Sequence, residues 1–308
     1  MTLDLALVGL GKIARDQHLP AIAATTGLRL AAIASRSAPE TDLPLYPDLA
    51  ALLAAEPGID GVTLCTPPQG RFDQAHTALL AGKHLMLEKP PGATLSEVQA
   101  LQELAAAQGV TLFATWHSRE AAGVAPARDW LAGRRIRRVE VVWKEDVRHW
   151  HPGQAWIWEP GGLGVFDPGI NALSIVTAIL PEPMRLERAD LSFPANRAAP
   201  IAADLAFRTA SGAPVTAAFD WRQTGPQSWD IRVETEDGGR LLLTHGGSRL
   251  TLDGAPALEA EDAEYRRLYA RFAALVAAGR SDVDLAPLTH VADAFLLGRR
   301  IEVEAFED

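Results

Sequence analysis

The chain begins with an apolar segment that leads directly into a glycine-rich turn. Residues 3–8 have the composition of a buried strand, and Gly9-Leu-Gly11-Lys-Ile-Ala14 follows them, with helix-compatible residues after it. In a strand–turn–helix unit, the first glycine permits a tight turn and the second lets a pyrophosphate approach the backbone. A small third residue lets the helix pack closely on the strand. Free N–H groups and the dipole at the helix start favour phosphate charge. The motif therefore predicts dinucleotide binding, and the residues expected to contact the dinucleotide here are Gly9, Gly11, Lys12 and Ile13.

Strand-like and helix-like segments alternate as far as residue 117. Strands are expected at 28–34, 61–65, 85–88 and 111–115, and helices at 48–53, 72–81 and 95–107. Alternation of this kind is typical of a parallel sheet covered by helices on both faces. We therefore predict a doubly wound α/β Rossmann domain over residues 1–117.

The pattern changes after residue 118. A helix is expected at 166–180, and turn signals such as Asp237-Gly238 and Asp253-Gly254 separate short strands between 202 and 252. Helices at 260–278 and 288–299 and a strand at 301–306 complete the chain. These elements predict an α+β domain over residues 118–308 with a large, open, mostly antiparallel sheet. We expect the terminal helix to pack back on the first domain.

Composition excludes several classes of partner. The 308 residues are 48% hydrophobic and 22% charged, as in ordinary globular proteins, and the net charge of −10 disfavours nucleic acid and anionic membranes as partners. Cys65 is the single cysteine, so no internal disulfide can form. The N-terminus resembles no signal segment, and no apolar run reaches membrane-spanning length. We expect a cytoplasmic protein.

Two further segments carry chemistry near the expected dinucleotide. Lys89 ends the apolar run 84–88, which places it in the crevice where open α/β sheets bind ligands, and Pro90 restricts the lysine backbone. The second strand ends in Ser35-Arg36, where no carboxylate is available to bind the ribose 2′-hydroxyl of NAD. An arginine there can pair with a 2′-phosphate, so NADP is favoured over NAD.

These features together resemble the Gfo/Idh/MocA family of oxidoreductases over nearly the whole chain. The resemblance rests on the glycine turn, on Thr66-Pro67-Pro68, on Glu88-Lys89-Pro90 and on the segment 161–171. Residues 142–152 are similar to bacterial sugar 1-dehydrogenases of that family that act on D-galactose and L-arabinose. The resemblance implies NAD(P)-dependent oxidation of an aldose at C1 to the aldonolactone. It also implies that the second domain binds the sugar and forms a homo-oligomer, at least a dimer.

The resemblance also assigns roles to residues. The family usually carries histidine where this chain has Asn171, which lies one helical turn after Asp167. Asparagine cannot accept a proton, so proton removal falls to Asp167, to Lys89 or to a relay between them. We expect Asp167 as the base, Lys89 as its partner at the C1 hydroxyl and Asn171 as a positioning group. The implied dinucleotide contacts are Gly9, Gly11, Lys12, Ile13, Ser35, Arg36, Thr66, Pro67, Glu88, Lys89 and His117. The implied sugar contacts are His117, Glu145, Trp150, His151, Asp167 and Asn171.

Other functions fit the sequence less well. Asn171 disfavours an inositol or polyol dehydrogenase, and the presence of Lys89 and Asp167 disfavours a regulator that binds a dinucleotide without turnover. The pair His149-x-His151 lacks a third ligand nearby, so we predict no metal. The tryptophans of this region could instead belong to the core or to a dimer interface.

Overall fold

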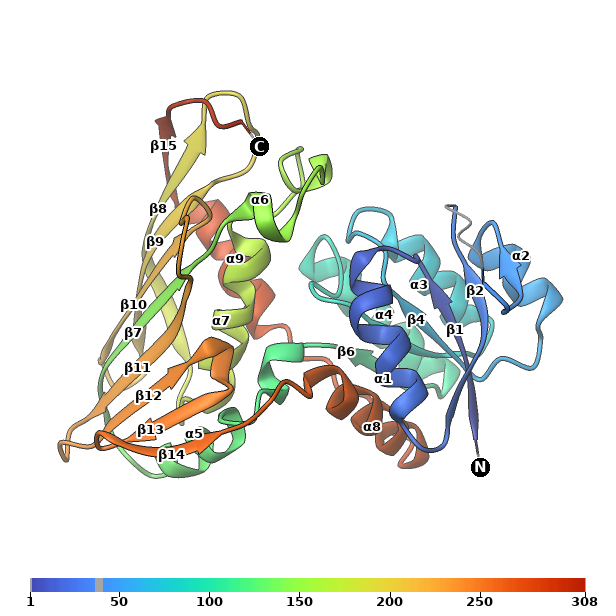
Figure 1. The fold of residues 1–308 in the computed structure, drawn as a ribbon, viewed down its shortest axis with the longest axis horizontal. Helices are drawn as coiled ribbons and strands as arrows, with labels where there is room; N and C mark the ends of the chain where they lie inside the picture. Colours follow the sequence, from blue (N-terminus) through green and yellow to red (C-terminus); the bar gives the residue numbers. More distant parts are fainter. Residues whose placement is uncertain (1, 37–40, 308) are drawn as a thin grey trace. The chain divides into compact units, whose positions relative to one another are not determined.

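The computed structural model describes residues 2–36 and 41–307, which fold into two compact units (Figure 1). The first unit comprises the chain up to His117 together with Glu264–Leu285. The second comprises Ser118–Ala263 and the chain from Ala286 onward. The helix that returns to the first unit is α8 (Glu264–Ala277), and the terminal helix α9 (Ala286–Leu297) belongs to the second. Among the described residues, no helix is both long enough and apolar enough to cross a membrane.

The first unit is built on a six-stranded sheet in the order β3-β2-β1-β4-β5-β6, in which every neighbouring pair is parallel. The order reverses between β1 and β4, the position where doubly wound sheets bind their ligands. The predicted Rossmann architecture is therefore confirmed. Its strands are β1 (Leu3–Val8), β2 (Leu28–Ala34), β3 (Leu45–Tyr46), β4 (Gly61–Leu64), β5 (His84–Leu87) and β6 (Leu112–Ala114).

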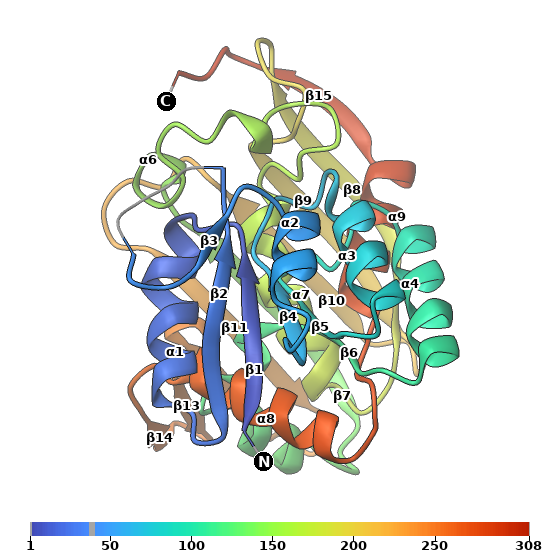
Figure 2. The ribbon, with the colours of Figure 1, turned by 90° about the vertical axis from the view of Figure 1, so that its right-hand side faces the viewer.

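Helices cover both faces of this sheet, because alternate strand side chains point to opposite sides. Ala6 and Val8 of β1 pack into a core that includes residues of α2, α3 and α4, whereas Leu5 and Leu7 pack into a core with residues of α1 and α8. In Figure 2, α3 and α4 lie side by side. These helices are α1 (Leu19–Ala24), α2 (Leu49–Ala55), α3 (Arg71–Leu80) and α4 (Leu95–Gln108), and a π-helical turn, η1 (Ala14–His18), precedes α1.

The second unit contains a nine-stranded sheet in the order β14-β13-β12-β11-β7-β10-β9-β8-β15. The pairs β7–β10 and β8–β15 are parallel and the others are antiparallel, as the predicted mostly antiparallel sheet requires. The strands are β7 (Ile136–Lys144), β8 (Met184–Pro194), β9 (Ala202–Thr209), β10 (Pro214–Asp220), β11 (Ser228–Thr235), β12 (Arg240–Thr244), β13 (Arg249–Leu252), β14 (Ala255–Glu259) and β15 (Arg299–Val303).

One face of the nine-stranded sheet is covered by helices, and α7 lies along it (Figure 1). The buried face carries apolar side chains such as Val141, Phe219 and Ile231. The helices of this unit are α5 (Val124–Leu131), α6 (Val147–Trp150), α7 (Phe166–Ile179) and α9, and the short 3₁₀ turns of the chain are η2 (His117–Glu120), η3 (Ala155–Ile157) and η4 (His245–Gly247).

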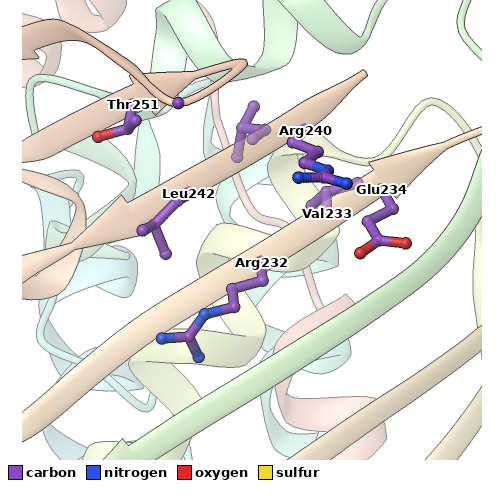
Figure 3. Close-up of a pocket in the computed structure, with 8 residues that line it drawn as sticks. Arg232, Val233, Glu234, Arg240, Leu242 and Thr251 are labelled. Atoms are coloured by element: carbon purple, nitrogen blue, oxygen red, sulfur yellow. The ribbon is translucent and has the colours of Figure 1, made fainter. Parts of the chain in front are cut away.

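The other face of this sheet is polar and carries cross-strand ion pairs, for example Arg138–Glu234 at 2.5 Å. A shallow hollow lies there over β11, β12 and β13, and Figure 3 shows Arg232, Arg240 and Leu242 along it. The hollow contains none of the predicted site residues, so we do not assign the chemistry to it.

Two strands of the second sheet were not predicted, β8 and β14. The sequence of β8 begins with the alternation expected of a half-buried strand, since Met184 and Leu186 are buried and Arg185 is exposed. A register shift between Leu186 and Arg188 then breaks the alternation and moves the later side chains to the opposite phase. Strands are hard to recognise by period across such an irregularity.

Candidate functional site

The glycine turn after β1 has the geometry that a phosphate loop needs. Gly9 has a φ of +90°, and a Cβ there would lie 2.9 Å from Thr66 Cγ2 and 3.1 Å from the Thr66 nitrogen. Any other residue would be strained in its backbone and crowded against β4's end. A Cβ on Gly11, in contrast, would meet no protein atom within 4 Å. The space over Gly11 is therefore open to a pyrophosphate.

The residues beside this turn are accessible to a ligand. Ile13 is 39% exposed, and the ammonium of Lys12 pairs with Asp16 one helical turn later. At the end of β2, the N–H of Ser35 donates to the Tyr46 carbonyl at 2.9 Å, and Arg36 is exposed. An exposed guanidinium at this strand end can receive a 2′-phosphate. The residues after Arg36 lie outside the described part of the chain until Thr41.

A buried arginine holds the Glu88-Lys89-Pro90 segment in place. The side chain of Arg71, at the start of α3, is 2% exposed and donates to the carbonyl oxygens of Thr66, Glu88 and Pro90. Thr66 also donates from its hydroxyl to Gln74 Oε1 at 2.7 Å, while Pro67 is exposed. A single guanidinium thus joins the ends of β4 and β5 and fixes the backbone on both sides of Lys89.

The Glu88 carboxylate is buried inside a hydrogen-bond network that sequence reasoning missed. Its Oε1 accepts from the Tyr265 hydroxyl at 2.6 Å and lies 3.0 Å from His18 Nε2, and its Oε2 accepts the Lys89 N–H at 2.7 Å. His18 is fully buried, and its Nδ1 lies 2.7 Å from the Tyr269 hydroxyl. The network therefore joins α8 and the end of η1 to the backbone of Lys89.

Burial alone would raise the pKa of Glu88, but the hydrogen bond and charge of His18, the charge of His117 and the hydrogen bond of Tyr265 together outweigh burial and lower that pKa. Burial of His18 likewise acts to lower the pKa of the imidazole, yet Cys65, Tyr269 and Glu88 raise that pKa well above its usual value. The two groups form a buried ion pair. The Glu88 carboxylate thus holds the Lys89 N–H from a buried position, and its predicted contact with a dinucleotide stays a prediction.

His117 follows β6, at the carboxyl edge of the same sheet. Its Nδ1 lies 2.6 Å from Glu264 Oε2, and its ring stacks on Tyr265 with 5.4 Å between centroids. Burial acts to lower the pKa of His117, but the pair with Glu264 raises it overall. α8 thus orients His117 as well as Glu88.

In the second unit, a glycine-rich loop delivers Asp167 to the first turn of α7. Gly164 has a φ of +53°, and a Cβ there would lie 2.2 Å from the Pro200 carbonyl oxygen. The chain can make this approach only with glycine, and α7 begins directly afterwards at Phe166. Asp167 is 3% exposed, and a carboxylate in the first turn is favoured by the helix dipole. Asn171, one turn later, is half-buried.

His151 lies against this aspartate. It follows α6, and its Nε2 is 3.2 Å from Asp167 Oδ2. Its Nδ1 is 3.3 Å from Gln154 Oε1, and its ring is 5.2 Å from that of Trp221. Histidine at 151 and aspartate at 167 were each predicted as sugar contacts, and the structure brings them into direct contact with each other.

Glu145 has an unexpected environment, because indole groups bind both of its oxygens. The Trp221 N–H donates to Oε1 at 3.1 Å and the Trp229 N–H donates to Oε2 at 2.9 Å, and Glu145 itself is 6% exposed. Trp150 is 37% exposed, donates to Gln227 Oε1 at 2.9 Å and packs near Trp229. The aromatic cluster is therefore wider than predicted, since Trp221 and Trp229 were not singled out.

The predicted residues thus fall into two groups. The first unit holds the glycine turn, Ser35-Arg36, Thr66-Pro67, Glu88-Lys89 and His117, and the second holds Glu145, Trp150, His151, Asp167 and Asn171. The supporting residues His18, Arg71 and Tyr265 had no sequence signal of their own, because most of their partners are distant in the chain. Among the described residues, no cluster of three or more potential metal ligands is present.

Comparison with known proteins agrees with this arrangement. Residues 3–115 match the model of the Gfo/Idh/MocA oxidoreductase family, NAD-binding Rossmann fold. The chain is 46% identical over 316 aligned residues to a galactose 1-dehydrogenase from Pseudomonas fluorescens, covering 99% of this chain and 98% of that protein. The chain belongs to the Gfo/Idh/MocA family. It is an oxidoreductase.

Solved structures extend the comparison to three dimensions. A D-galactose-1-dehydrogenase protein from Rhizobium etli superimposes with a TM-score of 0.95 and 58% identity, over 99% of this chain and 98% of that one. A 3-ketoreductase from Actinomadura kijaniata, solved with NADP and TDP-benzene, superimposes with a TM-score of 0.84 at 18% identity, over 98% of this chain and all of that one. At that identity the second likeness concerns the fold alone.

Proposed function

We propose that this protein is an NAD(P)-dependent sugar dehydrogenase that oxidises an aldose at C1 to the aldonolactone. The substrates we propose are D-galactose and L-arabinose. The observation that carries the proposal is the similarity to galactose 1-dehydrogenases, which extends over the whole chain, including the loop and helix that bear His151 and Asp167. L-arabinose has the ring stereochemistry of D-galactose and lacks only the C6 hydroxymethyl group, so a pocket for one sugar accepts the other.

The first unit would bind the dinucleotide, with NADP preferred. The open space over Gly11 and the strained, glycine-only turn at Gly9 suit a pyrophosphate. Ser35 and Arg36 would hold the 2′-phosphate of the adenosine ribose. When bound, the dinucleotide supplies the acceptor for the C1 hydrogen and its electron pair.

The reacting hydroxyl would be handled by Lys89 and Asp167. Glu88 and Arg71 fix the backbone of Lys89, so its ammonium can hold the C1 oxygen and stabilise negative charge as the proton leaves. Asp167 would accept the proton, and Asn171 would orient the sugar by hydrogen bonds. A positioned base of this kind typically contributes about 10²–10⁴-fold to the rate.

The second unit would supply the remaining sugar contacts. The exposed indole of Trp150 would offer an apolar surface to a pyranose ring, and His151 would offer a polar contact. His117, which belongs to the first unit, would offer a further polar contact. The Glu145 carboxylate, which accepts the two indole bonds, would also accept from a sugar hydroxyl, because a carboxylate has about four acceptor positions. We expect the protein to assemble as a dimer.

The reduction of NADP or NAD at 340 nm tests the proposal, with D-galactose, L-arabinose, D-glucose, D-xylose and myo-inositol as substrates. We expect fast reduction with galactose and arabinose, and higher kcat/KM with NADP. Asp167→Asn should lower kcat by about 10²-fold or more with little change in dinucleotide affinity. A protein that binds NADP tightly but turns over none of the sugars would refute the proposal.

A further inference from the structure

The hydrogen-bonding partners of His151 define where its protons lie. Gln154 Oε1 accepts a hydrogen bond from the Trp156 indole N–H at 3.1 Å. An indole N–H can only donate, so the amide atom that faces it is the oxygen. The same oxygen lies 3.3 Å from His151 Nδ1. His151 Nδ1 must therefore carry a hydrogen.

This tautomer has a consequence at the other ring nitrogen. In a neutral imidazole with its hydrogen on Nδ1, Nε2 carries only a lone pair. That lone pair would face Asp167 Oδ2 at 3.2 Å. Both atoms would then be hydrogen-bond acceptors, so no hydrogen bond would form between them. The contact becomes a hydrogen bond when one proton enters it, whether that proton resides on the imidazole or on the carboxyl. The pair is thus arranged to receive one proton.

We propose that Asp167 and His151 act as one proton-accepting unit, in which Asp167 takes the proton of the C1 hydroxyl and His151 Nε2 then shares it. The inference rests on the proposed function. In that reaction the C1–H bond breaks and its electron pair leaves with the hydrogen to the oxidised dinucleotide. The O–H bond also breaks, its electrons form the second C–O bond of the carbonyl, and its proton enters the Asp167–His151 contact.

The surroundings of the pair favour this role. The Asp167 side chain is 4% exposed, whereas that of His151 is 19% exposed, so the imidazole offers the proton a way to solvent after each turnover. Asn171, on the same helix face as Asp167, has no titratable atom. Charged and titratable groups on the elements around the pair have partners of their own. Glu145 accepts from the Trp221 indole, Asp146 pairs with Arg148, and Asp220 pairs with Arg222. His149 packs on Trp150, Arg148 lies over Phe306, and Arg197 lies over Trp158.

The decisive variant is His151→Gln, which keeps a hydrogen-bond donor for Asp167 but cannot take up the proton. We expect kcat for galactose to fall about 10–100-fold. We also expect the acidic inflection of the kcat–pH profile to move to lower pH, because a lone carboxylate then accepts the proton. A merely structural role would scale the profile without moving its inflection. The matched control is His149→Gln, whose exposed ring packs edge-on against Trp150 and which should leave kcat and the profile unchanged.

A second measurement needs no turnover. The ring Cε1–H resonance of His151 is assigned by its loss in His151→Gln and is titrated by NMR in the wild type and in Asp167→Asn. We expect the titration midpoint to fall by about one pH unit or more in Asp167→Asn, since the carboxylate stabilises the imidazolium. An unchanged midpoint would overturn the inference, as would wild-type kcat and inflection in His151→Gln. Absence of sugar oxidation by the wild type would instead defeat the proposed function and, with it, the role of the pair in sugar oxidation; the NMR titration would still show whether Asp167 and His151 share a proton.

Discussion

Two glycines of the same turn should respond in opposite ways to an added methyl group. Gly9→Ala places a Cβ at a φ of +90°, which costs about 1–2 kcal/mol for an L-residue. The same atom would lie 2.9 Å from Thr66 Cγ2 and 3.1 Å from the Thr66 nitrogen, and overpacking of this kind costs about 1–3 kcal/mol more. The expected loss of about 2–5 kcal/mol should lower the unfolding temperature by about 4 °C or more.

Gly11→Ala should leave the fold intact. Beyond Gly11 itself and its two chain neighbours, no atom of the described residues lies within 4 Å of the added Cβ. The carbonyl of Gly11 already accepts a helical bond from the Arg15 N–H at 3.2 Å. Reduced entropy of the unfolded chain should even stabilise this variant, by up to about 1 kcal/mol. The methyl group would occupy the space where a pyrophosphate meets the backbone, so the Kd for NADP should rise by at least about tenfold.

Differential scanning fluorimetry and calorimetric titration with NADP separate the two effects. The expected pattern is a destabilised Gly9→Ala protein and a stable Gly11→Ala protein that binds NADP poorly. Wild-type NADP affinity in Gly11→Ala would show that the pyrophosphate does not lie over this turn. Wild-type stability in Gly9→Ala would refute the packing argument itself.

Three further predictions concern charged groups. Arg36→Ala should raise the KM for NADP about tenfold or more and leave the KM for NAD nearly unchanged, because one charge-assisted hydrogen bond is worth about 1.5–3 kcal/mol. Equal effects on both dinucleotides in steady-state assays would contradict the assignment of Arg36 to the 2′-phosphate. Glu145→Ala should destabilise the protein by about 2–5 kcal/mol in urea unfolding, since the buried Trp221 N–H and the half-buried Trp229 N–H lose their acceptor. A neutral effect would mean that water replaces the carboxylate. Because folding raises the pKa of His18, its ion pair contributes its full stabilisation below about pH 6.5, the pKa of the unfolded chain, and this stabilisation is lost as the pH rises through the raised pKa. The pKa of Glu88 is lowered by folding, so the stabilisation from Glu88 is lost only in acid. The unfolding temperature of His18→Gln should therefore fall further below that of the wild type at pH 6 than at alkaline pH. A difference between the two unfolding temperatures that does not vary with pH would exclude the ion pair.

The first unit was predictable because its signals are local. The glycine turn, the apolar strands and the capped helix after Thr94 each lie within a few residues, and the α/β alternation then fixes the sheet. α8 was expected as a helix at 260–278, but its place in the first unit depends on packing across more than a hundred residues of intervening chain. No periodic pattern in the sequence indicates that Tyr265 contacts Glu88 or that Tyr269 contacts His18.

The candidate site divides in the same way. Lys89 and Asp167 stand out because each occupies a characteristic position, a strand end or the first turn of a helix after a glycine loop. Their supporting partners do not stand out. Arg71 is one of many arginines in the sequence, and only burial against three carbonyl oxygens distinguishes it. The tautomer of His151 likewise depends on Gln154 and Trp156, whose spacing alone indicates nothing.

The three buried carboxylates described above differ in what their partners can do with a proton. Glu145 accepts from two indoles, which are neutral donors that do not titrate, so these two partners cannot take part in proton transfer. Glu88 has a titratable partner in His18, but those side chains are 5% and 0% exposed, which closes the pair to solvent. Asp167 is the member of this set whose imidazole partner reaches solvent. Exchange of a proton in each turnover needs both a titratable partner and a route to water. This contrast is why we propose the base at Asp167 and His151, and propose that Glu88 positions Lys89.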